Sequence, residues 1–227
     1  MNNYIKESMF SYYDERADEY DELYTFGGGP ASITDRNIYK QEVIKIKKSI
    51  SKQNITGILY DVPCGTAFWM PSYYKNTNQI ILIDQSLNML EKAKERSKSL
   101  GCFHKCNFNK LNAFDLNTLK LTPSVLLIGF FLSHLNIREE IRFFSIIKNI
   151  LYKHGKIIIL DSTWSDERAK TRDKEGSQSR KLNNGTEFKI YKKYFTINDI
   201  KNIGERELFN VKIEFFGKAF FSAVLYT

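Results

Sequence analysis

The sequence of 227 residues predicts an α/β protein with an open, mostly parallel sheet and helices on both faces. From residue 57 to residue 161, short apolar runs alternate with amphipathic segments, which is the pattern of repeated strand–helix–strand units. The apolar runs show no strict alternation with polar residues, as is typical of strands buried on both faces of a parallel sheet. Residues 210–227 instead predict two strands around Gly217, an antiparallel hairpin that closes one edge of the sheet.

The segments before the sheet are expected to be helical. Residues 5–24 predict one helical segment of mixed aromatic and acidic character, and the glycine-rich loop Gly27-Gly28-Gly29-Pro30 follows it. Residues 35–52 carry apolar side chains at helical spacing and predict an amphipathic helix that starts at Asp35. We therefore expect an N-terminal lid helix and loop over residues 1–34, followed by a single domain over residues 35–227.

The apolar runs of the central region predict five strands, at residues 58–62, 79–83, 102–108, 124–129 and 156–160. Two helices are expected between them: Ser86 caps one that runs up to Gly101, and the other spans residues 137–152. Residues 162–182 are polar without an apolar period, residues 186–195 alternate like a strand, and Thr196 opens a short helix. The stretch of about residues 162–195 is expected to be an insertion on the substrate side.

The net charge is +8, from 34 Lys and Arg against 26 Asp and Glu. The hydrophobic and charged fractions, 42% and 26%, exclude a disordered chain, and no apolar run approaches the ~20 residues of a membrane helix. A basic chain can bind nucleic acid, an anionic membrane or an anionic substrate, and an AT-rich genome explains an excess of lysine equally well. The excess is local, however: Arg168–Lys193 holds nine bases against three acids. This favours an anionic or carboxylate-bearing small substrate over a nucleic acid strand, and a solvated basic face is the alternative.

Three cysteines in a chain poor in glycine and proline argue against a disulfide framework and indicate a reducing, cytoplasmic location. The N-terminus is acidic and rich in tyrosine, unlike a secretory signal. Cys102, His104 and Cys106 alternate along a predicted strand and would share one face, but no fourth ligand is evident. We interpret them as packing residues and expect no metal site.

Three strand ends carry residues suited to a ligand, because open α/β sheets bind ligands at the carboxyl ends of their strands. In the first, the Asp61–Ala67 turn, Gly65 lets backbone amides approach a ligand, and the turn is expected to lead into a helix N-terminus. The second is Asp84, whose carboxylate suits a ribose diol, and the third is Asn112-Ala113-Phe114, which can frame an adenine ring. A single glycine instead of G-x-G-x-x-G favours a nucleoside ligand without a pyrophosphate.

Between Gly57 and Ser162, five motifs follow one another in the order and spacing of a known family. They are ILYDVPCGTA, ILIDQSLNMLEKAKER, KLNAFDL, VLLIGFFLSHL and LYKHGKIIILDS. Here the chain resembles the class I S-adenosylmethionine-dependent methyltransferases, and ERADEYDELY near the N-terminus looks like the cap helix of members that act on small molecules. The resemblance implies a Rossmann-like sheet of seven strands with an antiparallel final hairpin, S-adenosylmethionine as cofactor and S-adenosylhomocysteine as product.

The resemblance also assigns cofactor-binding residues position by position. Asp61, Pro63, Cys64 and Gly65, with Thr66 beside them, fall on the first motif, which wraps the methionine moiety. The remaining assignments are Asp84 to the ribose, Gln85, Met89, Asn112, Ala113 and Phe114 around the adenine, Phe130 near the sulfonium, and Tyr20 from the lid. Two positions depart from the family. The usual G-x-G-x-G is here Pro63-x-Gly65-x-Ala67, and Asn112 stands where Asp is common, so its carbonyl oxygen must accept from the adenine.

For the transfer step, we expect His134, just past the fourth predicted strand, and Tyr13 of the lid to orient and deprotonate an oxygen or nitrogen nucleophile. The substrate-binding candidates are Tyr24, Trp164, Arg168, Arg180 and Tyr191. The first interpretation is thus a small-molecule methyltransferase, a monomer or homodimer without a membrane partner. An RNA methyltransferase and a non-catalytic cofactor-binding protein stay open. Nucleic acid is disfavoured because Gly129-Phe130-Phe131-Leu132 lacks the Asn/Asp-Pro-Pro-aromatic motif of enzymes that methylate base amino groups.

Overall fold

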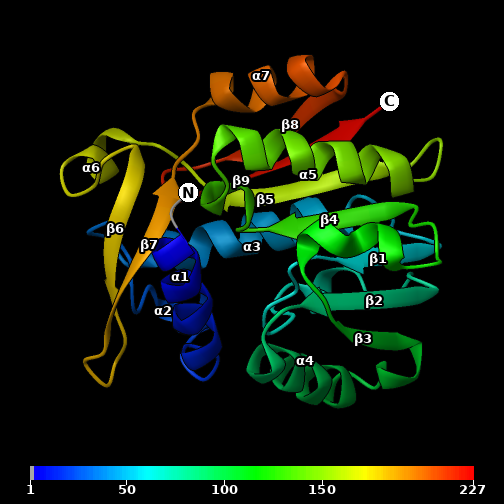
Figure 1. Cartoon of the computed structure of the whole chain (residues 1–227), viewed down its shortest axis with the longest axis horizontal. Coiled ribbons are helices and arrows are strands. Elements are labelled where there is room, and N and C mark those ends of the chain that lie inside the picture. Colours follow the sequence, from blue (N-terminus) through cyan, green and yellow to red (C-terminus); the bar gives the residue numbers. More distant parts are fainter. Residues whose placement is uncertain (1–2) are drawn as a thin grey trace.

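A computed structural model describes residues 3–227 and shows a seven-stranded sheet between two layers of helices (Figure 1). The strand order is β3-β2-β1-β4-β5-β9-β8. The strands are β1 (Ile58–Asp61), β2 (Gln79–Asp84), β3 (Cys106–Lys110), β4 (Val125–Gly129), β5 (Lys156–Ser162), β8 (Asn210–Phe216) and β9 (Phe220–Tyr226). Strands β1 to β5 pair in parallel, and β9 runs antiparallel to both β5 and β8. The predicted fold class is confirmed.

The central strands β1, β2, β4 and β5 are largely apolar because their two faces are covered by different helices. Helices α3 (Asn37–Ser51) and α4 (Leu87–Ser99) pack on one face, and α5 (Ile137–Ile150) and α7 (Ile197–Glu207) pack on the other. Strand β2 illustrates the division: Ile80 and Leu82 join the first core, whereas Ile81 and Ile83 join the second. Full burial of such a side chain stabilises the fold by roughly 1.5–3 kcal/mol, so apolar burial on each face stabilises the packing of both helix layers on the sheet.

Capping side chains fix where the helices begin. The Ser86 Oγ accepts a hydrogen bond of 3.0 Å from the Met89 amide, which confirms it as the cap of α4. Asn136 with Glu139, and Thr196 with Asp199, form complete capping boxes before α5 and α7. These caps set the helices at defined points after β2, β4 and β7 (Glu187–Lys193).

A second layer of structure lies over the carboxyl ends of the parallel strands. It consists of α1 (Asn3–Glu15), α2 (Glu22–Phe26), the short α6 (Asp166–Ala169) and an antiparallel pair made of β6 (Glu175–Lys181) and β7. Helix α1 lies against β7, and the β6–β7 pair stands apart from the main sheet (Figure 1).

Four expectations from the sequence were wrong in detail. Residues 5–24 are not one helix, because a turn at residues 16–21 separates α1 from α2. The loop after β1 does not lead into a helix N-terminus but into the single 3-10 turn η1 (Met70–Ser72), because Ala67 takes a left-handed backbone conformation (φ +55°) that a right-handed helix cannot contain. Residues 103–105 form the 3-10 turn η2, so β3 starts only at Cys106. Cys102, His104 and Cys106 therefore share no strand face.

The fourth error is strand β6, which was not expected within residues 162–182. Its inward-facing residues are Gln178 and Arg180, so no apolar alternation marks it in the sequence. Two further 3-10 segments, η3 (Ala113–Thr118) and η4 (Leu132–His134), follow β3 and β4. Within residues 3–227, no helix is both long enough and apolar enough to cross a membrane.

Candidate active site

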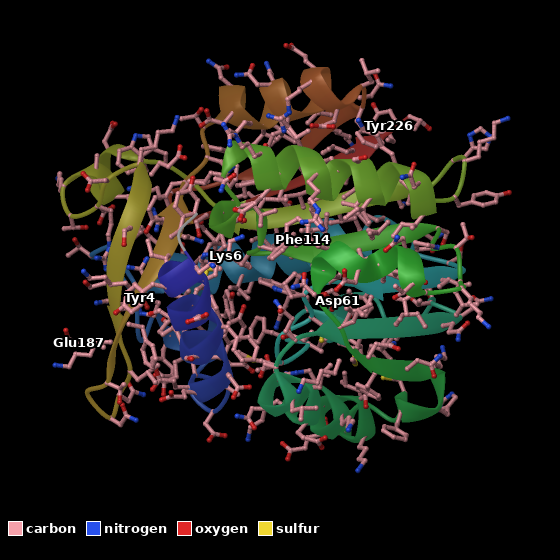
Figure 2. The ribbon with its side chains drawn as sticks, in the orientation of Figure 1. Tyr4, Lys6, Asp61, Phe114, Glu187 and Tyr226 are labelled. Atoms are coloured by element: carbon pink, nitrogen blue, oxygen red, sulfur yellow. The ribbon has the colours of Figure 1, made fainter. Side chains whose placement is uncertain are left out.

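The larger of two adjoining cavities lies at the carboxyl ends of β1, β2 and β4, under α1. It has a volume of about 370 Å³, within the range of small-molecule sites. Most of the cofactor-binding residues predicted from the sequence line it, namely Tyr20, Pro63, Gly65, Asp84, Gln85, Met89, Asn112, Phe114 and Phe130. Lys6 of α1 and Phe114 of η3, both labelled in Figure 2, belong to its wall. The structure thus brings together residues from segments that are far apart in the sequence.

Asp84 organises the floor of this cavity. Its Oδ2 accepts a hydrogen bond of 2.9 Å from the Gly65 amide and its Oδ1 one of 2.9 Å from the Ser86 amide. Each carboxylate oxygen keeps a further lone pair, so the group can still accept from a ribose diol. Burial raises the pKa of Asp84 to about 6, although the two backbone donors act in the opposite direction.

Asn112 and Phe114 form the edge of the cavity beyond Asp84. The Asn112 Nδ2 donates to the Gln85 Oε1 over 3.1 Å, and the Phe114 amide donates to the Asn112 Oδ1 over 2.9 Å. The guanidinium of Arg142 lies 5.0 Å from the centre of the Phe114 ring. These contacts hold an amide and an aromatic face in place, which are the groups an adenine needs.

Gly65 has the backbone conformation that the loop requires. Its φ is +51°, and a Cβ added there would lie 3.3 Å from the Tyr20 ring. Glycine adopts this left-handed conformation without steric cost because it has no Cβ, whereas other residues adopt it only at a cost in free energy. Gly65 therefore lets Tyr20 close directly over the loop.

Four other residues predicted for the cofactor lie behind the wall rather than in it. The Tyr73 hydroxyl donates to Asp61 over 2.6 Å, and burial raises the pKa of Asp61 to about 8. Cys64 and Ala113 are buried, and the Thr66 Oγ1 donates to the Asp21 Oδ1 over 2.6 Å. Of the residues described, these four support the loop and the strand ends without lining the larger cavity.

The N-terminal segment is tied to the cofactor side by polar contacts that the sequence did not suggest. Asp21 accepts from Thr66 and also pairs with Arg96 of α4, whose Nε donates to the Thr66 carbonyl over 2.8 Å. Further along, the Ser86 Oγ donates to the Asp14 Oδ1 over 2.6 Å. Because these partners are distant in sequence, no local pattern marks them.

The second cavity, of about 50 Å³, lies between the N-terminal segment and the β6–β7 pair. Four basic side chains line it: Arg16, Arg168, Arg180 and Lys192, which are 3%, 4%, 6% and 7% exposed. No carboxylate belongs to its lining among residues 3–227. Buried cations without a nearby acid are costly, and such a site therefore favours an anion.

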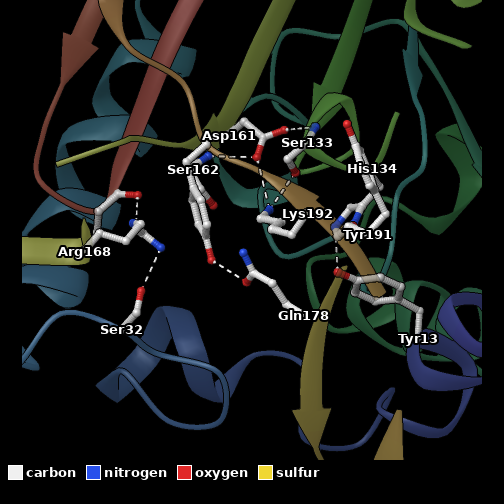
Figure 3. A network of polar contacts seen from close by, with 12 residues as sticks. Tyr13, Ser32, Ser133, His134, Asp161, Ser162, Arg168, Gln178, Tyr191 and Lys192 are labelled. Carbon is white, nitrogen blue, oxygen red and sulfur yellow. Dashed lines mark hydrogen bonds and ion pairs between the residues drawn. The ribbon is translucent and has the colours of Figure 1, made fainter. Parts of the chain in front are cut away.

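Of these four cations, only Lys192 has a counter-ion beside it among residues 3–227. The Lys192 Nζ donates to the Ser133 Oγ over 2.6 Å and lies 3.4 Å from the Asp161 Oδ1 (Figure 3). Arg168 donates to the Ser32 Oγ and to the Ala219 carbonyl, both over 2.9 Å. These partners hold the cations but leave most of their positive charge uncompensated.

Arg180 is held in the same way, through neutral groups. Its Nη2 donates to the Gln178 Oε1 over 2.8 Å. It faces the cavity because residues 178 and 180 are the inward positions of β6, just as 190 and 192 are those of β7. The remaining bases of Arg168–Lys193 largely face outward or pair with acids, such as Lys174 with Asp199.

Tyr13 and His134 meet where the two cavities adjoin. Tyr13, Tyr20 and Phe130 line both cavities, and the Tyr13 hydroxyl lies 2.7 Å from the His134 Nε2. The His134 Nδ1 lies 2.7 Å from the Tyr191 carbonyl, which can only accept, so Nδ1 carries the proton. Burial, and then the charge of Lys192, hold the pKa of His134 well below its usual value. His134 is therefore neutral, and its Nε2 accepts from Tyr13.

Of the other residues predicted to bind substrate, Tyr24 lies in the wall of a cavity, but Trp164 and Tyr191 do not. Tyr24 lines the small cavity and donates to the Tyr20 hydroxyl over 3.2 Å. Trp164 packs against Tyr194, with ring centres 6.0 Å apart, and the Tyr191 side chain turns outward to Glu175. Neither Trp164 nor Tyr191 belongs to the lining of the larger or the smaller cavity. Tyr191 contributes through its backbone carbonyl instead.

The chain is similar to known methyltransferases in part of its sequence and in its fold. Residues 59–155 match the model of a family described as methyltransferase domain. A comparison with curated proteins gives no significant match.

Solved structures extend the likeness to the whole chain. The DhpI–SAM–HEP complex has a TM-score of 0.81 at 17% identity, with 100% of both chains covered. The DhpI–SAH complex has a TM-score of 0.77 at 18% identity, with 99% of this chain and 98% of the other covered. For an S-adenosylmethionine-dependent methyltransferase from Clostridium acetobutylicum ATCC 824, the TM-score is 0.63 at 14% identity, with coverage of 94% and 98%.

At these identities the structural likeness concerns the fold, whereas the family match concerns the region that forms the floor of the larger cavity. The matched region contains β2, β3, β4 and all but the first residue of β1, together with Gly65, Asp84 and Asn112. The sequence match to a methyltransferase domain thus spans residues 59–155, whereas the likeness in fold to these solved structures spans nearly the whole chain.

Proposed function

We propose that the protein transfers the methyl group of S-adenosylmethionine to an oxygen or nitrogen atom of a small anionic molecule. The observation that carries this proposal is the pair of adjoining cavities, one suited to a nucleoside and the other lined by four buried cations. Their shared residues, Tyr13, Tyr20 and Phe130, mark the place where donor and acceptor would meet.

The residues of the larger cavity fit this cofactor. Asp84 offers lone pairs to the ribose hydroxyls, and Asn112 and Phe114 offer an amide and a ring to the adenine. The cofactor supplies an activated methyl group on a sulfonium, so the protein chiefly has to position the acceptor and exclude water. Helix α1 serves that purpose by covering the cavity.

Tyr13 is suited to orient the acceptor. Because its hydroxyl hydrogen is directed to the His134 Nε2, its oxygen lone pairs remain free to accept from an acceptor O–H or N–H. A proton from the acceptor can pass to the Tyr13 oxygen while the Tyr13 proton passes to His134. An anion in the small cavity would offset the charges of Lys192 and Arg180 and so make His134 a better base.

A small substrate fits better than RNA. The cations are enclosed between the N-terminal segment and the β6–β7 pair, and the cavity they line measures about 50 Å³. A nucleic acid is instead bound along an exposed basic surface. The three cysteines are free, which agrees with a reaction in the reducing cytoplasm.

Methyl transfer to a panel of small molecules tests the proposal. We expect labelled methyl from S-adenosylmethionine to appear in small carboxylates, sulfonates or phosphate monoesters, and not in their neutral analogues. Arg168→Met should raise KM by about tenfold or more, because it removes one charged contact. Lys189→Gln, which removes an exposed charge from the same region, should leave KM unchanged. Transfer to neutral analogues at the same rate would contradict the anionic assignment.

A further inference from the structure

Arg16 differs from the other three cations of the small cavity in where it is anchored. Arg168, Arg180 and Lys192 come from α6, β6 and β7, whereas Arg16 comes from the turn that follows α1. The same short segment closes over the larger cavity. Arg16 is therefore the cation of this cavity that belongs to the cover of the proposed cofactor site.

The Arg16 guanidinium is buried without full compensation. Its Nε and Nη2 atoms have no hydrogen-bond partner among residues 3–227, although Arg16 is only 3% exposed. It lies 5.1 Å from the centre of the Tyr20 ring and 5.5 Å from that of Tyr12, contacts that stabilise a cation but satisfy no N–H donor. Buried unpaired donors of a charged group are costly, and an anion in the cavity would relieve that cost.

On both sides of Arg16 in the sequence, residues contact the wall of the proposed cofactor site. Two residues before it, Asp14 accepts from Ser86, which follows directly on the Asp84–Gln85 pair. After it, Tyr20 lies over Gly65 and Asp21 accepts from Thr66. A displacement of Arg16 would therefore disturb the contacts of Asp14 on one side, or those of Tyr20 and Asp21 on the other.

We propose that Arg16 is a positioning residue that couples the two sites. When a substrate anion pairs with its guanidinium, the segment from Asp14 to Asp21 is held over the cofactor loop, so the anion and the cofactor bind more tightly together than separately. This inference rests on the proposed function. It assigns to Arg16 the cooperativity between the sites, and to Arg168, Arg180 and Lys192 the greater part of the anion's affinity.

The alternative is that Arg16 only supports the fold, through its contacts with Tyr12 and Tyr20. The two roles differ in what they predict for ligand binding. A structural role changes the stability of every state of the protein alike, whereas a coupling role changes the effect that one ligand has on the affinity for the other.

Calorimetric titration with S-adenosylhomocysteine, with and without saturating inorganic phosphate as the anion, tests the coupling. In the wild-type protein, phosphate should lower the Kd of S-adenosylhomocysteine by about fivefold or more. In turn, S-adenosylhomocysteine should lower the Kd of phosphate by the same factor. In Arg16→Gln the effect should fall below about twofold, whereas the control Lys189→Gln should keep the wild-type value. If Arg16→Gln lacks the wild-type circular dichroism spectrum, Arg16→Lys replaces it, because lysine keeps the charge but not the forked donor set.

The outcomes separate the coupling from the function on which it rests. A full wild-type phosphate effect in Arg16→Gln, or in Arg16→Lys where it is the variant used, overturns the proposal. So does a wild-type protein that binds S-adenosylhomocysteine with no response to phosphate. Failure of the wild-type protein to bind S-adenosylhomocysteine at all counts instead against the proposed function.

Discussion

As the proposed ribose ligand, Asp84 is expected to make the affinity for the cofactor fall at low pH. Its carboxylate accepts from the Gly65 and Ser86 amides and would accept from the ribose as well. Burial raises its pKa to about 6, so the group is ionised above that pH and protonated below it. Because the ionised form is the better acceptor, affinity for S-adenosylhomocysteine should fall as the pH drops through 6.

The size of this effect follows from the pKa. At pH 5, one unit below a pKa of about 6, about one tenth of the protein carries the ionised carboxylate, so the Kd should be about tenfold higher than at pH 8. Asp84→Asn removes the charge while keeping one acceptor oxygen. Loss of a charge-assisted hydrogen bond costs about 1.5–3 kcal/mol, which corresponds to a rise in Kd of roughly 10- to 150-fold.

Calorimetric titration of S-adenosylhomocysteine between pH 5 and pH 8 measures both changes. The wild-type Kd should rise toward low pH, whereas Asp84→Asn should bind weakly with a much flatter profile. Glu91→Gln serves as control, since Glu91 is an exposed carboxylate on α4 outside the cavity, and it should behave like the wild type. A wild-type Kd that changes less than about twofold over this range, or an unchanged slope in Asp84→Asn, would refute the reasoning.

Three further predictions concern the loop, the buried acid behind it and the acceptor site. Gly65→Ala should weaken S-adenosylhomocysteine binding by about tenfold, because an alanine at φ +51° costs about 1–2 kcal/mol and its Cβ meets Tyr20. Gly101→Ala, at φ +68° with open space around its Cβ, should lower the Tm without weakening binding; equal losses of affinity would contradict the role of Tyr20. The raised pKa of Asp61, about 8 against an ordinary 3.8, means that stability is lost as the pH rises between those values. Asp61→Asn should therefore gain Tm over the wild type increasingly from pH 5 to pH 8, and a constant difference would argue against a buried, neutral Asp61. Tyr13→Phe should lower kcat by about tenfold or more at an unchanged Kd for S-adenosylhomocysteine, whereas the exposed Tyr152→Phe should not; equal kcat values would remove Tyr13 from the acceptor site.

The sequence was most informative where burial leaves a pattern. The strands of the main sheet are apolar because both faces are covered, so β1, β2, β4 and β5 lie within a residue or two of their expected bounds. Strand β6 left no such pattern, since its inward residues, Gln178 and Arg180, are polar and not apolar. The break between α1 and α2 was also missed, because residues 16–21 are placed by contacts with distant elements.

The site divides in the same way. The place of Asp84 and Asn112 in the wall of the larger cavity could be predicted because the fold fixes where a strand end lies. Arg16 could not, because an arginine among acidic residues is typical of a solvated helix face. Tyr191 was expected to contact substrate through its side chain, but strand alternation turns that side chain outward and leaves only the carbonyl beside His134.

A crystal structure of the protein with S-adenosylhomocysteine and inorganic phosphate would test most directly the claim that two adjoining cavities hold donor and acceptor. The ribose hydroxyls should lie within hydrogen-bond distance of Asp84, the sulfur should face Phe130 and Tyr13, and phosphate should lie among Arg16, Arg168, Arg180 and Lys192. S-adenosylhomocysteine bound elsewhere, or phosphate absent from the four cations while the cofactor site is filled, would contradict it.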